Sequence, residues 1–297
     1  MELLYKYLNG NVEVSLFDDG TKIQEWGDNE GANPIFPNSM DVKITNYCDL
    51  NCKFCHEMST TKGEHGNIDF LLSILKDLPA GTELAIGGGN PLDHPDLLKF
   101  LGKCKEMRLV CNMTVNYKHI IPFIKTINQL LDDKMIFGLG ISINDSSNLD
   151  VVKLIHNRSN IVYHVIAGVN NISILDKIKD SEVNKVLILG YKEVGRGIDY
   201  YSEDVKFAKN EWFSKLPHYI GKIHLSFDNL AIDQLNIRRF FNEESWKDFY
   251  MGTDGQFTMY IDAVKQEYAV SSTSKERFPI KGTISEIFSN VRSVKGF

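Results

Sequence analysis

Three cysteines lie close together in one short segment of the sequence. Cys48, Cys52 and Cys55 form a C-x3-C-x2-C arrangement directly after a predicted strand. A loop of this length can turn three thiolates toward one face of an iron-sulfur cluster, which leaves one iron without a protein ligand. At catalytic metal sites, substrates and cofactors bind at such open positions. The spacing therefore predicts a cluster with room for a further ligand.

Two other interpretations of the cysteine segment compete with a cluster. A structural zinc ion usually takes four protein ligands, and His56 follows Cys55 too directly for comfortable tetrahedral closure. The cysteines can also be buried side chains without chemistry. The chain has five cysteines, an odd number, and the close spacing of three of them does not suit a disulfide framework. We therefore favour the cluster over both alternatives.

A run of glycines ends the next predicted strand. Gly87, Gly88 and Gly89 are followed by Asn90 and Pro91. Closely spaced glycines let backbone groups approach a ligand, because they have no side chain in the way. A flexible turn is the alternative interpretation.

Polar residues and glycines also close the later strands. The candidates are Thr114 and Asn116 after the third strand, Ser142 and Asn144 after the fourth, Gly168 after the fifth and Arg196 after the sixth. Ser142 and Asn144 alternate with isoleucines, so both side chains are expected on one face. Arg196, between glycines, can clamp a carboxylate, or it is a solvated turn residue.

The elements that position these residues alternate between strands and helices. Short apolar runs alternate with longer amphipathic stretches, the pattern of a parallel sheet wound with helices. The predicted strands are residues 42–45, 83–86, 108–114, 136–143, 161–166 and 185–189, and the predicted helices include residues 68–78, 95–104, 120–131 and 149–156. The candidate residues fall at the carboxyl ends of the strands, where parallel barrels carry their chemistry.

The two ends of the chain depart from this alternation. Residues 1–36 predict a small β extension with turns at Asn9-Gly10 and Asp19-Gly20, and residues 27–39 have the composition of a linker. After the sixth unit we expect a strand at residues 222–227, a helix at 232–240 and a hairpin at 257–270. The expected domains are residues 1–36, 41–220 and 221–297.

These motifs resemble the radical S-adenosylmethionine (SAM) superfamily. Its signature has the same cysteine spacing with an aromatic residue before the last cysteine, where Phe54 stands. The glycine run is similar to the family's Gly-Gly-Glu-Pro motif, with Asn90 in place of the glutamate. The ending Thr114 to Asn116 is similar to a Thr-Asn ending in the family. The resemblance covers about residues 41–197.

The resemblance implies an α/β fold, a partial (β/α)6 TIM-like barrel with the N-terminal β extension and a C-terminal α+β subdomain closing its side opening. It implies that Cys48, Cys52 and Cys55 hold a [4Fe-4S] cluster whose open iron binds SAM. Reductive cleavage of SAM then gives a 5′-deoxyadenosyl radical that abstracts hydrogen from a substrate. The implied cofactor-binding residues are Phe54, Gly87, Gly88, Gly89, Asn90, Thr114, Asn116, Ser142, Asn144, Gly168 and Arg196. A flavodoxin or ferredoxin is the implied electron donor.

Residues 251–262 resemble the hairpin of SPASM or twitch extensions, which are found in radical SAM enzymes that often modify peptides. No cysteine follows Cys111, so an auxiliary cluster bound through thiolates is excluded there. Cys104 and Cys111 are expected to be small buried side chains. A peptide or protein is the leading substrate, and a small metabolite or nucleotide is the alternative. A non-catalytic electron carrier or redox sensor is the competing class, and a degenerate binding barrel is a third.

Composition bounds the partners. The formal net charge is -6, whereas domains that track nucleic-acid phosphates are usually basic, so a nucleic-acid partner is not expected. No apolar run is long enough to span a bilayer and no signal peptide pattern opens the sequence. We expect a soluble cytoplasmic protein without a membrane partner.

Overall fold

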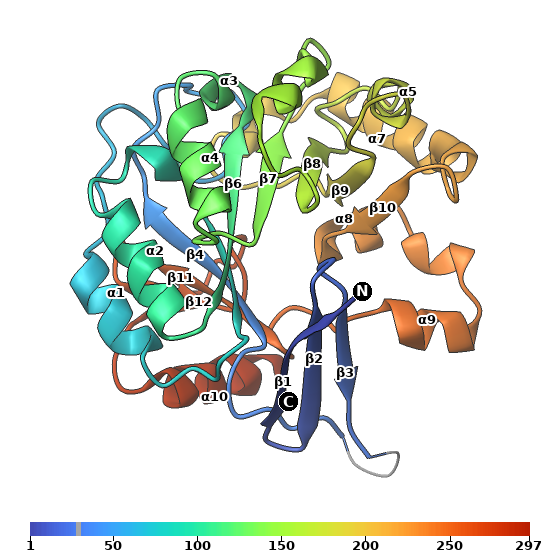
Figure 1. Ribbon diagram of the computed structural model, residues 1–297. Helices are drawn as coiled ribbons and strands as arrows, with labels where there is room; N and C mark the ends of the chain where they lie inside the picture. The colour runs from blue at the N-terminus through green and yellow to red at the C-terminus, as the bar shows by residue number, and fades with distance from the viewer. Residues whose placement is uncertain (28–30) are drawn as a thin grey trace.

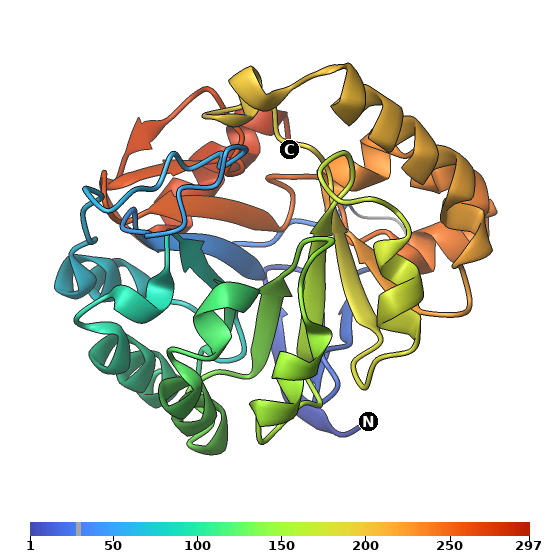
Figure 2. The same cartoon turned by 90° about the horizontal axis from the view of Figure 1, so that it is seen from above.

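A curved ten-stranded sheet forms the centre of the protein in the computed structural model, which describes residues 1–27 and 31–297 (Figures 1 and 2). The strand order is β10-β9-β8-β7-β6-β5-β4-β11-β12-β13. Every neighbouring pair from β10 to β11 is parallel, and only the pairs with β12 are antiparallel. The predicted mixed α/β class with a parallel sheet is confirmed.

The six predicted core strands are neighbours in sequence order. They are β4 (Ser39–Thr45), β5 (Glu83–Gly88), β6 (Val110–Asn116), β7 (Gly138–Ser142), β8 (Ile161–Ile166) and β9 (Lys185–Leu189). Within the described residues the sheet order ends at β10 and β13, which do not pair, so the barrel is open.

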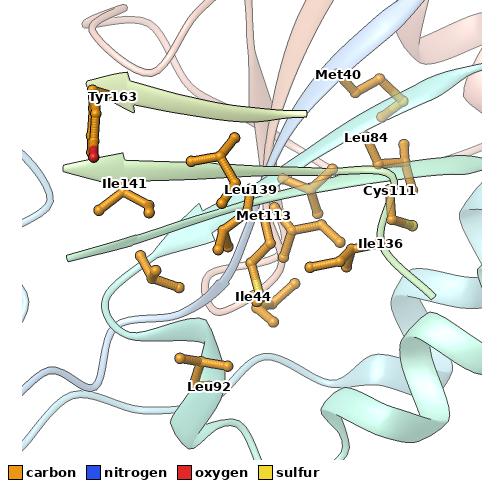
Figure 3. Packing of buried hydrophobic residues seen from close by; sticks show 14 of the residues in the cluster. Met40, Ile44, Leu84, Leu92, Cys111, Met113, Ile136, Leu139, Ile141 and Tyr163 are labelled. Atoms are coloured by element: carbon orange, nitrogen blue, oxygen red, sulfur yellow. The ribbon is translucent and has the colours of Figure 1, made fainter. Parts of the chain in front are cut away.

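Helices cover the outer face of this sheet (Figure 1). They are α1 (Ile68–Leu75), α2 (Leu97–Glu106), α3 (Tyr117–Ile120), α4 (Ile124–Asp132), α5 (Ile174–Lys179), α6 (Gly197–Tyr200) and α7 (Glu203–Lys215), with short 3-10 helices η1 (Pro91–Asp93), η2 (Leu149–Leu154) and η3 (Leu216–His218). Apolar side chains of alternate strand positions, such as Leu84, Met113 and Ile141, are buried against the helices (Figure 3). Burial of these apolar side chains is the main favourable contribution to folding.

Three predicted helices differ from the observed ones. The helix expected at residues 120–131 is split into α3 and α4, because Pro122 lacks the N–H that a continuous helix needs. The helix expected at 149–156 is η2, whose adjacent β-branched residues Val151 and Val152 favour a helix weakly. The helix expected at 232–240 is split at Asn236, whose φ of 48° is left-handed.

The N-terminal extension is a separate antiparallel sheet of β1 (Leu3–Asn9), β2 (Val12–Phe17) and β3 (Lys22–Glu25), as predicted. It lies at the amino ends of the core strands (Figure 1). Lys22 forms an ion pair with Glu83 at the start of β5, and Asn160 donates to the carbonyl of Asp18. The extension therefore covers the bottom of the barrel, and the expectation that it closes the side opening is wrong. Part of the predicted linker, residues 28–30, lies outside the described residues.

The C-terminal strands join the same sheet as the core. They are β10 (His224–Phe227), β11 (Thr258–Asp262), β12 (Glu267–Ala269) and β13 (Phe278–Pro279), with α8 (Asn229–Gln234), η4 (Ile237–Phe240), α9 (Glu243–Phe249) and α10 (Ile284–Lys295). β10 extends the sheet beside β9, and the hairpin strand β11 extends it beside β4. The sheet thus contains strands from both sides of the expected domain boundary at residue 220. The domain boundaries and the likeness to SPASM or twitch extensions stay predictions. No helix in the described part of the chain is long and apolar enough to cross a membrane.

Candidate functional site

The strand register brings most of the predicted polar residues to the inner face of the sheet. Thr114 lies opposite Gly140, and Asn116 lies opposite Ser142, which in turn lies opposite His164. Residues in register on parallel strands share a face, and the intervening residues are the buried apolar ones on the helix side. The inner face is therefore lined by half-buried polar groups at the carboxyl end of the barrel.

The cluster loop, residues 46–66, connects β4 to α1 and carries the three cysteines. It folds back on itself, because the N–H of Asn46 donates to Glu64 O at 2.8 Å and the N–H of Cys48 donates to Thr60 O at 3.0 Å. Gly63 allows this close return, since an added Cβ there would lie 1.8 Å from Asn46 O. The loop is thereby held over the carboxyl end of β4.

All three loop cysteines are free and half-buried. Burial raises the pKa of the Cys48 thiol. It also raises the pKa of Cys52, where Cys55 adds to the effect and Arg196 opposes it. The three thiols thus lie on one folded loop, partly exposed and without a disulfide.

The glycine run packs against the cluster loop. Gly89 N–H donates to Thr45 O at 2.8 Å and Asn90 N–H donates to Tyr47 O at 2.7 Å. A Cβ on Gly89 would lie 2.0 Å from Tyr47 O, while one on Gly87 would meet nothing within 4 Å. Gly88 and Gly89 thus permit the contact between strand and loop, and Gly87 faces open space in which a ligand fits.

Asn90, which stands where the family motif has glutamate, is turned toward the protein. Its Nδ2 donates to the Asp93 carboxylate at 2.8 Å. Its Oδ1 is buried and has no hydrogen-bond partner among the described residues. A buried acceptor without a donor costs free energy.

Arg196 buttresses the cluster loop from the opposite side of the barrel. Its Nε donates to Cys52 O at 2.8 Å and one terminal nitrogen donates to Ser59 O at 3.0 Å. Its backbone N–H donates to Cys55 O at 3.2 Å. These contacts position the segment between Cys52 and Ser59, and the predicted carboxylate clamp stays a prediction.

The remaining predicted residues are spread around the strand ends. Asn144 Oδ1 accepts from Ser146 N at 3.0 Å, so it shapes a turn. Asn116 caps α3, and Gly168, at φ 103°, lies against Lys209 of α7. The Phe54 ring lies 5.7 Å from the ring of Tyr200.

The sequence did not single out the histidine of β8 for a role, but the fold places it on the inner face. Burial lowers the pKa of His164 to about 4. Gly140 makes room for it, since an added Cβ would lie 2.5 Å from the imidazole. A neutral imidazole therefore faces the same space as Thr114 and Ser142.

A buried charged network joins Glu57 of the cluster loop to β4 and β11, and of its members only Glu57 was an acid-base candidate from the sequence. Lys43 of β4 contacts Glu57 at 2.7 Å and Asp262 of β11 at 3.1 Å. Tyr260 O–H donates to Glu57 at 3.0 Å. Burial opposes ionisation of Glu57, but His56 and Lys43 outweigh it and lower its pKa. A lysine inside an apolar strand was the available signal, and the partners from β11 were not readable because they are distant in sequence.

His119, on α3, is a further residue that the sequence did not predict for the site. Its Nε2 lies 2.8 Å from the Asp49 carboxylate, directly beside Cys48. Its Nδ1 is buried without a partner among the described residues. This contact joins α3, the helix that follows β6, to the cluster loop. Cys104 and Cys111, in contrast, are buried in the core, as predicted.

Solved structures with a similar fold include SuiB of Streptococcus suis. SuiB bound to the precursor peptide SuiA matches with a TM-score of 0.62 at 15% identity, over 89% of this chain and 68% of SuiB. SuiB bound to S-adenosylmethionine matches with a TM-score of 0.58 at 16% identity, over 88% of this chain and 68% of SuiB. At these identities the likeness shows the fold alone. No curated protein sequence matches the chain.

A family model described as the radical SAM superfamily matches residues 42–197. The matched segment begins in β4, contains the cluster loop and the glycine run, and ends just after Arg196. It spans more than half of the 297 residues. The protein is therefore an enzyme of the radical SAM superfamily, whose cofactors are an iron-sulfur cluster and SAM.

Proposed function

We propose that Cys48, Cys52 and Cys55 hold a [4Fe-4S] cluster and that SAM binds beside it at the carboxyl end of the barrel. The observation that carries this proposal is the placement of three free, half-buried thiols on one folded loop against the glycine run. The open space at Gly87 also fits a ligand beside the loop. When bound, the reduced cluster and SAM supply a 5′-deoxyadenosyl radical that abstracts hydrogen from the substrate.

The chain's own residues orient the cofactor in this proposal. The backbone at Gly87, which faces open space, would approach the amino group of SAM, and Asn90 would lie in the same segment. Phe54 would contact the adenine. The remaining proposed contacts are Gly88, Gly89, Thr114, Asn116, Ser142, Asn144, Gly168 and Arg196. The N-terminal sheet covers the bottom of the barrel, at the end opposite to this proposed site.

A peptide or protein is the proposed substrate. It is supported by the fold shared with SuiB, one structure of which holds a precursor peptide. A small metabolite or nucleotide is the alternative substrate class, and a flavodoxin or ferredoxin is the proposed electron donor. The catalytic acid, base or hydrogen donor is not assigned.

The cluster assignment is tested by Cys52→Ala, with Cys104→Ala as the matched control. Both variants lose one thiol, but Cys104 is buried in the core away from the loop. After anaerobic reconstitution we expect Cys52→Ala to lose the bound iron and sulfide and Cys104→Ala to keep them. An iron content in Cys52→Ala equal to that of the wild type contradicts the assignment.

A further inference from the structure

A cavity of about 410 Å³ adjoins the cluster loop at the β11 side of the inner face, where Lys43 is in register with Gly87 and with Asp262. Its walls come from the loop at residues 56–58, from the β9–α6 connection at residues 194–195, and from the C-terminal strands β11 and β12 with the segment 272–277 that follows them. In Figure 2 the cluster loop, drawn in blue, lies beside the C-terminal strands, drawn in red. A ligand in this cavity would lie directly beside the segment that follows Cys55.

The acidic side chains at the floor of the cavity share one cation. Glu57 and Asp262 line it, and both carboxylates contact Lys43. Asp262 also accepts hydrogen bonds from the N–H groups of Val264 and Lys265 at 3.0 and 3.1 Å. Both carboxylates are therefore hydrogen-bonded and ion-paired, and the group of three side chains keeps one excess negative charge.

The cationic side chains of the C-terminal segment in this cavity form no ion pair with a carboxylate of the described residues. Arg277, Lys265 and Lys275 line the cavity, and among the described residues no carboxylate lies within ion-pair distance of them. Glu267 is the one further acidic residue of the lining. The lining as a whole has four cationic and three acidic side chains, a net charge of +1, and the cations without an ion-pair partner lie together on the wall formed by the C-terminal segment.

Arg277 is held in place as a preformed donor. It is half-buried, its guanidinium lies 4.8 Å from the centre of the Tyr260 ring, and one terminal nitrogen donates to Ser272 O at 2.6 Å. A guanidinium carries five N–H donors, so most of them remain free. Lys192 adds positive charge behind the same wall, with its Nζ 2.9 Å from Ser272 Oγ.

We propose that this cavity binds a carboxylate of the substrate, with Arg277 as its anchor, so that the preferred peptide carries an acidic residue beside its reaction site. A planar guanidinium matches a carboxylate with two parallel hydrogen bonds. The hydroxyl groups of Ser272, Thr273 and Ser274 supply further donors in the lining. This inference rests on the proposed peptide substrate, and peptide binding, its main readout, does not require a loaded cluster.

The test measures fluorescence anisotropy of fluorescein-labelled hexaglutamate and hexaglutamine on the reduced full-length apoprotein. We expect hexaglutamate to bind at least about tenfold tighter, the range of charge-assisted hydrogen bonds. Arg277→Met, which retains apolar contact with Tyr260, should lose about tenfold for hexaglutamate alone. Lys275→Met, an exposed change that cannot disrupt the core, should lose less but in the same direction.

Lys222→Met is the matched control, because it removes one exposed positive charge outside the cavity. Equal affinities of hexaglutamate for Arg277→Met and Lys222→Met overturn the proposal, and so does equal binding of the two peptides to the wild type. SAM affinity of the reconstituted proteins separates the two sources of a carboxylate. If Arg277→Met weakens SAM binding and leaves the peptide preference intact, the cavity serves the cofactor and the proposal is wrong.

Discussion

The buried network around Lys43 makes the sharpest prediction about stability. The side chains of Lys43, Glu57 and Asp262 are only 5%, 11% and 6% exposed, and the lysine is the shared partner of both carboxylates. Lys43→Met fills a similar volume but leaves two buried carboxylates without their cation. Removing one partner of a buried ion pair costs about 3–5 kcal/mol.

We expect a value near the lower end of that range. Glu57 keeps the Tyr260 hydroxyl, and Asp262 keeps two backbone N–H donors. A loss of about 3 kcal/mol corresponds to a fall in Tm of roughly 6–12 °C for a large domain. The measurement is thermal unfolding of the apoprotein by circular dichroism at neutral pH.

Lys99→Met is the control, because Lys99 pairs with Asp69 on the surface, where the side chains are 46% and 75% exposed. Such a pair contributes less than about 1 kcal/mol. A fall in Tm for Lys43→Met no larger than that for Lys99→Met refutes the reasoning. Adding Asp262→Asn to Lys43→Met should recover part of the loss, because it removes one of the two uncompensated charges.

Three further predictions follow from single contacts. Gly89→Ala should lower the cluster content after reconstitution, because its Cβ would lie 2.0 Å from Tyr47 O. Gly87→Ala should keep the Tm and the cluster content of the wild type but weaken SAM binding in equilibrium dialysis, because its Cβ would enter open space. Equal cluster content and equal SAM affinity of the two variants would contradict the separate roles of the two glycines. Asn9→Ala should lower the free energy of unfolding in urea by about 3 kcal/mol, since it removes four hydrogen bonds made by a side chain that is itself buried, and a loss under 1 kcal/mol contradicts this. The pKa of His164 is about 4 in the folded chain. Between pH 6.5 and 4 the unfolded chain therefore binds a proton that the folded chain does not, and the free energy of unfolding falls with falling pH by up to about 3 kcal/mol. His164→Asn should remove this part of the pH dependence, and a pH dependence equal to that of the wild type contradicts the prediction.

The parallel core was predictable because its signals are local. Each strand from β4 to β9 is a short apolar run, and the cysteines and glycines follow strands at fixed spacing. Helix breaks were less readable, because Pro122 lay inside an otherwise amphipathic stretch. Local sequence patterns predict the strands and helices, and they predict contacts correctly only between elements that follow one another in the sequence.

The rest of the site depends on contacts between distant segments. The pairing of β11 with β4 brings Asp262 beside Lys43, and no local pattern encodes that register. The same holds for Arg196, whose contacts with Cys52 and Ser59 arise only when the sixth unit returns beside the first. The placement of β1–β3 below the barrel likewise depends on pairs such as Lys22 with Glu83.

The most direct test of the central claim is chromatographic detection of 5′-deoxyadenosine after anaerobic reconstitution and reduction in the presence of SAM. The account predicts that this product forms and that it disappears when Cys48, Cys52 or Cys55 is replaced by alanine. A fully loaded cluster that yields no 5′-deoxyadenosine, and whose electron paramagnetic resonance spectrum does not change when SAM is added, would contradict it.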